Sequence, residues 1–143
     1  MLNRMFFAQN SGSNVVFPPR TYGRLYNSDA YSALNFAPSG WRTASGYDWA
    51  YVSSFLGGTP TAGSPAKEVG TTHWTSPNSD ATNSSGLTLL GGGFRYSIDG
   101  QFYFLKDYGL YASPRNGDIF VTTASYNQTN LPTTQSPGCD VIS

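Results

Sequence analysis

Few residues in this chain of 143 could carry out catalysis. His73 is the only histidine and Cys139 the only cysteine, which excludes a zinc site built on several histidines or on several cysteines. A Ser-His-Asp triad would have to use His73, which lies in a Thr-Thr-His-Trp string without a nucleophile elbow. Glu68 is the only glutamate, and a glycosidase site with paired carboxylates would need an aspartate beside it. The sequence therefore predicts a protein that is not an enzyme and has no catalytic residues.

Calcium is the metal ion for which the chain offers neighbouring ligands. Asn78, Asp80 and Asn83 lie close together along a polar stretch and carry oxygen atoms of the kind that Ca²⁺ binds. Their spacing does not match an EF-hand loop, and asparagine and aspartate also stabilise turns through hydrogen bonds to their own backbone. We therefore expect these residues to shape turns, and we expect no metal site and no cofactor. A bound Ca²⁺ is the alternative.

Two segments rich in tyrosine and amide side chains, 106–116 and 126–135, are candidates for contact with a ligand. Tyrosine presents a large rigid ring with a polar tip, and amides adapt their hydrogen bonds to a partner. The predicted ligand-binding residues are Asp107, Tyr108, Tyr111, Arg115, Asn116, Tyr126, Asn127 and Asn130. Two alternatives remain for these residues: ordinary solvated loops, or aromatic side chains buried against a neighbouring subunit.

The composition narrows the classes of partner. Charged residues make up only 11% of the chain, and eight basic and eight acidic residues give a formal net charge of zero. Nucleic acid binding needs a cationic stripe that neutralises phosphates, and the sequence has no run of basic residues. No stretch approaches the roughly 20 apolar residues that span a bilayer. We therefore expect no nucleic acid partner and no membrane insertion.

Start and stop signals predict one well-defined helix. Ser45 and Asp48 have the spacing of a capping box, in which each side chain accepts a hydrogen bond from the other residue's backbone. Gly57 and Gly58 supply a left-handed stop. Between these signals, one apolar face at helical spacing is expected from Trp49, Val52, Phe55 and Leu56.

The rest of the sequence predicts two further short helices in the first half of the chain and mainly strands in the second half. We expect helices from residue 27 or 28 to 34 and over 64–69, and a polar loop over 75–85. Strands are expected at 5–8, 87–90, 94–98, 102–104, 108–111, 119–124 and 141–142, with Asp99 and Gly100 forming a hairpin turn. This order predicts an α+β fold, and the length predicts a single domain over residues 1–143.

Short motifs follow one another along the chain in a characteristic order. They are Tyr22-Gly23-Arg24-Leu25-Tyr26, Pro38-Ser39-Gly40-Trp41, Asp48-Trp49, Phe55-Leu56-Gly57-Gly58, Ala62-Gly63, Thr72-His73-Trp74, Ala81-Thr82-Asn83-Ser84-Ser85-Gly86, Gly92-Gly93-Phe94-Arg95 and Asp99-Gly100-Gln101-Phe102. This series resembles the Fibrobacter succinogenes major paralogous domain, which is common in surface proteins of Bacteroidota and in phages that infect them. The resemblance covers nearly the whole chain.

The resemblance implies a C-type-lectin-like fold, with early helices and a twisted, mostly antiparallel sheet that displays variable binding loops. It implies no catalytic activity. The chain departs from the family pattern at two places in its carboxy-terminal half. Tyr111-Ala112-Ser113-Pro114 stands where a Trp-Trp-Ser-Ser string is usual, and Val141-Ile142-Ser143 stands where Val-Arg-Cys is usual. Loop shape and ligand in that half are therefore not carried over from the family.

Resemblance and composition together predict a non-enzymatic surface-display binding module. We expect a phage virion protein, such as a head or tail fibre or decoration protein, located at the virion surface. Its partners would be a host cell-surface glycan or protein, other virion proteins, and further copies of itself in a homo-oligomer such as a trimer. The first ten residues lack the apolar core of a secretion signal, which fits release by host lysis. The alternatives are a secreted or cell-surface adhesion domain of a bacterium, cut from a longer precursor, and a purely structural virion subunit.

Overall fold

The computed structural model describes residues 5–6, 19–23, 25–26, 37, 39–96, 98–115 and 118–135. Its helices are α1 (Pro19–Tyr22), α3 (Gly46–Phe55) and α4 (Gly63–Ala66). Its strands are β1 (Met5–Phe6), β2 (Leu25–Tyr26), β3 (Phe94–Arg95), β4 (Phe102–Tyr103), β5 (Tyr108–Arg115), β6 (Asp118–Ser125) and β7 (Thr133–Gln135). Short helices and small antiparallel sheets confirm the α+β class for the described part of the chain.

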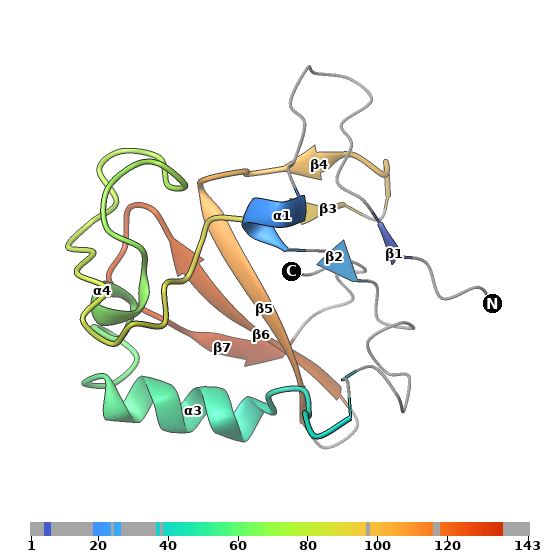
Figure 1. Ribbon diagram of the computed structural model, residues 1–143, viewed down its shortest axis with the longest axis horizontal. Helices are drawn as coiled ribbons and strands as arrows, with labels where there is room; N and C mark the ends of the chain where they lie inside the picture. Colours follow the sequence, from blue (N-terminus) through green and yellow to red (C-terminus); the bar gives the residue numbers. More distant parts are fainter. Residues whose placement is uncertain are drawn as a thin grey trace.

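The antiparallel sheet of β5, β6 and β7 is the central element of the molecule (Figure 1). β5 pairs with β6 from Tyr108 opposite Ser125 to Arg115 opposite Asp118. β7 pairs with the other edge of β6, where the Thr122 and Thr133 hydroxyl oxygens are 2.8 Å apart. The last two residues of β6, Ala124 and Ser125, are both buried, and α3 packs against all three strands of the sheet.

β3 and β4 form a short hairpin that confirms the expected turn. Asp99 Oδ1 accepts a hydrogen bond from the Gln101 amide at 2.9 Å, and Gly100 has a φ of +71°. This left-handed backbone favours glycine, and the aspartate closes the turn through its own side chain. Tyr103 donates its hydroxyl to Asp99 Oδ2 at 2.6 Å, which lowers the pKa of that carboxyl group.

α3 begins with the capping box that the sequence predicts. Ser45 Oγ accepts from the Asp48 amide at 3.2 Å, and Asp48 Oδ2 accepts from the Ser45 amide at 2.7 Å. Arg42 Nη2 donates to the same carboxylate at 2.9 Å, and this bond lowers the pKa of Asp48. Gly57 and Gly58 follow the helix with φ values of +99° and +92°. The start and the stop of this helix are therefore both confirmed.

The face of α3 that meets the sheet differs from the expected one. Gly46 and Ser53 are buried, and Trp49 and Leu56 pack against the core. Phe55, which we expected on this face, is 80% exposed. The buried stripe runs through the small residues because they let the helix backbone approach the sheet, and this rotation turns Phe55 outward.

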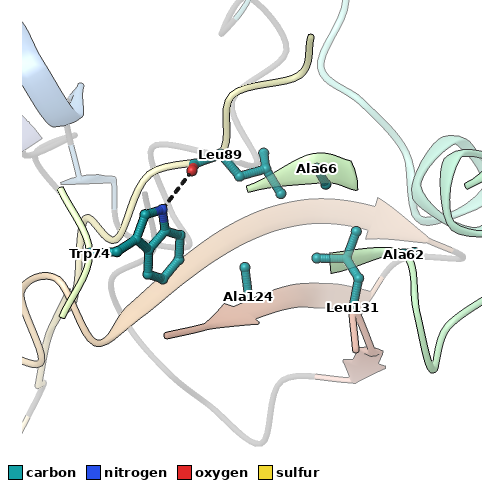
Figure 2. Packing of buried hydrophobic residues seen from close by; sticks show 6 residues of the cluster. All are labelled: Ala62, Ala66, Trp74, Leu89, Ala124 and Leu131. Atoms are coloured by element: carbon teal, nitrogen blue, oxygen red, sulfur yellow. Dashed lines mark hydrogen bonds between the residues drawn. The ribbon is translucent and has the colours of Figure 1, made fainter. Parts of the chain in front are cut away.

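A tryptophan is the largest fully buried side chain among the described residues (Figure 2). Trp74 is fully buried, and its Nε1 donates to the Leu89 carbonyl at 3.0 Å. Trp74 lies at one end of a buried cluster that also contains Ala62, Ala66, Leu89, Ala124 and Leu131. Because three members of this cluster are alanines, the indole supplies much of its apolar volume.

Several element boundaries differ from the sequence predictions. α4 covers four residues instead of 64–69, because Lys67 at its end adopts an extended backbone. The expected strand at 87–90 is reduced to a single parallel bridge between Leu89 and Lys67. β5 extends well beyond residue 111, and β7 lies in a segment that we expected to be a loop.

Other expected elements are shorter or cannot be compared. β3 is two residues long, shorter than the strand expected at 94–98. β1 covers Met5–Phe6 of the strand expected at 5–8, and residues 7–8 lie outside the described part of the chain. The expected helix at 27–34 and the strand at 141–142 lie outside the described residues, as does Cys139. None of the helices in the described ranges is long and apolar enough to cross a membrane.

Replacing Trp74 with phenylalanine should lower the free energy of unfolding by about 1–3 kcal/mol. The smaller ring leaves a void and removes one of the two donors to the Leu89 carbonyl, which keeps its bond from the Glu68 amide. Urea denaturation followed by circular dichroism measures the change. Trp41→Phe is the matched control, since Trp41 is 78% exposed and should shift stability by less than about 0.5 kcal/mol. Equal effects of the two substitutions would contradict the burial of Trp74 in the core.

Candidate functional site

An open polar depression lies where three loop segments meet. They are the turn 59–60 after α3, the pair 79–80, and the connection 127–130 between β6 and β7. The depression has a volume of about 650 Å³ and is lined by Thr59, Pro60, Ser79, Asp80, Asn127, Gln128, Thr129 and Asn130. Asp80 is the one charged residue in this lining, and most of the other lining residues carry a hydroxyl or amide group.

Backbone hydrogen bonds tie the walls of the depression to neighbouring parts of the chain. The Leu131 amide donates to the Thr59 carbonyl at 2.8 Å, which joins the first segment to the third. The Ser79 amide donates to the Tyr126 carbonyl at 2.8 Å, which joins the second segment to the residue preceding the third. The walls are therefore fixed by the chain itself before any ligand is bound.

The ammonium group of Lys67 joins the same segments from inside. Lys67 is completely buried, and its Nζ donates to the carbonyls of Gln128 at 2.8 Å, Ser125 at 2.9 Å and Ser79 at 3.1 Å. An ammonium group has three N–H donors and no acceptor, so every donor of Lys67 has a partner. Two of these carbonyls belong to residues that line the depression.

Several forces act on the charge of Lys67. Burial lowers the pKa of Lys67 to about 8, and the negative charge of Asp80 acts in the opposite direction. The carbonyl acceptors also favour the protonated amine. The centre of a Trp74 ring lies 5.7 Å from Nζ, within the range of a cation–π interaction. With a pKa of about 8, Lys67 carries its charge at neutral pH.

The rim of the depression presents hydrogen-bonding groups to solvent. Asp80 and Gln128 are exposed and Asn130 is half-buried, and these three side chains form no hydrogen bond within the described part of the chain. Asn127 is exposed, and its Oδ1 accepts from Ser125 Oγ at 2.7 Å. Because amides both donate and accept, this arrangement can bond a ligand that carries several hydroxyl groups.

The second predicted binding segment contributes to the depression directly. Asn127 and Asn130 both line it. Tyr126 instead is half-buried and packs against the core, and its amide donates to the Asp107 carbonyl at 3.0 Å. The structure therefore brings together the two amides of this segment and gives its tyrosine a place in the packing.

The first predicted binding segment forms a strand, and its Tyr111 faces inward. Tyr111 lies on β5 and packs against the core and against Trp49, with ring centres 5.4 Å apart. Its hydroxyl donates to the Leu90 carbonyl at 2.8 Å and accepts from the Leu90 amide at 2.9 Å. Burial raises the pKa of Tyr111. Tyr111 thus holds β5 to the segment before β3 and does not line the depression.

The other predicted residues of segment 106–116 either do not line the depression or lie outside the described part of the chain. Asp107 Oδ1 accepts from Thr75 Oγ1 at 2.6 Å, and the Tyr108 ring packs edge-on against Phe104. The side chain of Arg115 and all of Asn116 lie outside the described part of the structure. A ligand contact by any of these four residues stays a prediction.

Lining residues other than Asn127 and Asn130 complete the site. Gln128 and Thr129 lie in the same polar run as the two predicted amides, so the run itself was a signal for them. Asp80 was considered as a calcium ligand and was not among the predicted ligand-binding residues. Nothing in the sequence around Lys67 marks it, because the carbonyls that it binds lie 12, 58 and 61 residues away.

The residues considered for calcium carry out separate tasks. Asn78 is buried, and its Nδ2 donates to the backbone carbonyls of Glu68 and Gly70 at 2.8 and 2.6 Å. Asn83 exchanges two hydrogen bonds with Thr88, each 2.9 Å long. All three candidates have left-handed backbone, with φ values of 47°, 50° and 48°. The described residues hold no cluster of three His, Cys, Asp or Glu side chains that could bind a metal ion.

The histidine and the glutamate of the chain bind one another away from the depression. His73 Nδ1 lies 2.8 Å from Glu68 Oε1 and 2.9 Å from Oε2. The Tyr22 ring meets the imidazole edge-on, with ring centres 5.3 Å apart. Burial and the Glu68 charge raise the pKa of Tyr22. This cluster connects α1 to the loop that carries Trp74.

A second surface feature is an aromatic face on α3. Tyr47, Tyr51 and Phe55 recur at a spacing of four residues and are 56%, 74% and 80% exposed. Tyr51 and Phe55 also border an apolar groove of about 340 Å³, whose other wall includes Leu87. This face is chemically distinct from the depression, because its side chains are aromatic and aliphatic.

Comparison with known proteins gives one match. A family model, the Fibrobacter succinogenes major domain, matches residues 10–120. No curated protein matches the chain, and no solved structure does. The matched range contains α3, Lys67, Trp74 and Asp80, whereas the segment 127–130 follows it. The match confirms the resemblance seen in the motif order, and its extent shows that this chain belongs to the Fibrobacter succinogenes major domain family.

Proposed function

We propose that this chain is a non-enzymatic surface-display module of C-type-lectin-like fold that binds a glycan through the polar depression. The observation that carries the proposal is the preformed lining of 59–60, 79–80 and 127–130, held by backbone bonds and presenting amides, hydroxyls and one carboxylate. A preorganised site loses little entropy on binding, which favours recognition of a flexible, hydroxyl-rich ligand. A host surface protein is the second candidate ligand.

A role in binding rather than in catalysis agrees with the residues around the depression. Its lining contains no histidine or cysteine and no second carboxylate beside Asp80. General acid–base chemistry on a sugar would need two carboxyl groups on either side of the bond that is cleaved. His73, the only histidine of the chain, contacts Glu68 in another part of the molecule.

We further propose that the chain is a phage virion protein at the virion surface, with a host cell-surface molecule and other virion proteins as partners. The family membership and the low-charge composition support this proposal. A secreted or cell-surface adhesion domain of a bacterium is the alternative. A signal peptide or lipobox encoded upstream in the gene would support the alternative, and neighbouring genes for virion assembly would support the phage role.

Fluorescently labelled protein should bind selectively to some strains in a panel of Bacteroidota cells, and periodate oxidation of surface sugars should abolish this binding. The double variant Asn127→Ala, Asn130→Ala should weaken binding about tenfold or more, since it removes amides from the lining. Flow cytometry against protein concentration measures the affinity.

The control for this prediction is Thr134→Ala, Gln135→Ala, which alters exposed polar residues of β7 outside the depression. This variant should bind as the unaltered protein does. Full binding by a folded Asn127→Ala, Asn130→Ala variant would contradict the position of the site. Binding that survives periodate would identify a protein ligand instead of a glycan.

The aromatic face of α3 favours a second role, in assembly. We propose that Tyr51, Phe55 and the adjoining groove pack against another copy of the chain in a homo-oligomer such as a trimer. Large exposed aromatic side chains grouped on one helix are typical of interaction surfaces. Such packing would leave the depression available to ligand, because the two surfaces share no lining residue.

Light scattering coupled to size-exclusion chromatography tests this assembly. The protein should elute at a multiple of its 15.4 kDa chain mass, and Tyr51→Ser, Phe55→Ser should shift it to the monomer. Ile98→Ser is the control, because Ile98 is 80% exposed in the β3–β4 connection, away from the groove. A monomeric unaltered protein at high concentration would contradict the proposal.

A further inference from the structure

Lys67 occupies a cage built from three backbone carbonyls. These carbonyls, of Ser79, Ser125 and Gln128, come from two stretches of chain more than forty residues apart in sequence. The side chain reaches them from the end of α4 and is 0% exposed. We infer that this cage is a built-in ammonium site, in which the side chain of Lys67 does for the polar depression what a bound metal ion does in a cation-dependent binding module.

The number and type of ligands in the cage fit an ammonium group. Three carbonyl oxygens within 3.1 Å match the three donors of a primary ammonium. A water molecule has only two donors, so one of the three carbonyls would lose the hydrogen bond that Nζ supplies, which is costly. Ca²⁺ takes six to eight oxygen ligands, and the positive charge of Lys67 opposes its entry.

The cage determines where the ligand-facing side chains stand. Ser79 and Gln128 supply cage carbonyls and also line the depression. Asp80 directly follows Ser79, Asn127 directly precedes Gln128, and both are lining residues as well. A cation that fixes these carbonyls therefore fixes one side of the depression. Lys67 is a positioning residue, since it is buried and acts on the lining through the backbone.

This inference rests on the proposed function only in treating the depression as the ligand site. Its consequence is that the shape of the depression needs no added metal ion. Chemical rescue tests the cage without any glycan, so its failure can be told apart from a failure of glycan binding.

The test replaces Lys67 with alanine and supplies the lost group as n-propylammonium chloride. Lys67→Ala should lower the melting temperature and should raise amide hydrogen exchange about tenfold in peptides 76–82 and 124–131, because three carbonyls lose the hydrogen bond from Nζ. Peptide 46–56, which covers α3, should change less. n-Propylammonium should restore both the melting temperature and the protection of the two peptides.

The controls separate the charge and its donors from simple filling of space. Tetramethylammonium has the charge without N–H donors, and 1-propanol fills the space without the charge, so neither should rescue. Lys106→Ala, at the other lysine of the chain, should show no response to n-propylammonium. Equal rescue by 1-propanol and n-propylammonium would overturn the inference, as would unchanged exchange in Lys67→Ala.

Two further measurements test the inference if the Lys67→Ala variant does not fold. Lys67→Ala should then refold when n-propylammonium is present, and refolding in 1-propanol alone would overturn the inference. Lys67→Met keeps the apolar stem without the charge and should show the same faster exchange in peptides 76–82 and 124–131. EDTA should leave the melting temperature and the exchange of the unaltered protein unchanged, and a fall caused by EDTA would show that a metal ion is needed.

Discussion

One buried ammonium group organises the polar side of this molecule. Removing a charge from water is costly unless it is paired and hydrogen-bonded, and Lys67 meets this condition with carbonyl oxygens instead of a carboxylate. Carbonyls belong to the backbone, so the interaction constrains the path of the chain directly. The loops 79–80 and 125–128 must pass close to Nζ, and their positions define one wall of the depression.

A small residue in α4 allows Lys67 to reach the three carbonyls. Lys67 can reach the cage because α4 ends directly before it and packs closely on the segment 129–130. A Cβ atom on Gly63 would lie only 2.6 Å from the Asn130 carbonyl oxygen, so a larger residue there would push the loop away. Trp74 belongs to the same buried cluster as Ala66 of α4 and Ala124 of β6, and its ring lies within cation–π range of Lys67. The apolar packing of the core and the hydrogen bonds of Lys67 thus both depend on α4.

Local signals in the sequence predicted local structure well. The capping box at Ser45 and the Asp99 turn each involve groups within three residues of one another, and both formed as expected. The family was also readable, because the order of its motifs does not depend on tertiary contacts. The boundaries of α4 and the short strands were not predicted, since long-range pairing and burial decide where they end.

The candidate site was predicted only in part for the same reason. Asn127 and Asn130 were found because a run of amides is visible in sequence. Tyr111 looked like a contact residue, yet its hydroxyl bonds Leu90, 21 residues away, and no local pattern shows this. Lys67 was missed because its partners are backbone carbonyls, which every residue has, so no residue type in the sequence marks them.

Nuclear magnetic resonance of the Lys67 ammonium group tests the central claim most directly. With ¹⁵N-labelled lysine, Lys67 should give an ammonium signal that exchanges slowly with water at neutral pH, unlike that of Lys106, and that titrates with a pKa of about 8. The unfolded chain keeps this proton to about pH 10.4, so the free energy of unfolding should rise relative to that of Lys67→Met between about pH 8 and 10. A fast-exchanging Lys67 signal with the pKa of an exposed lysine would contradict the account.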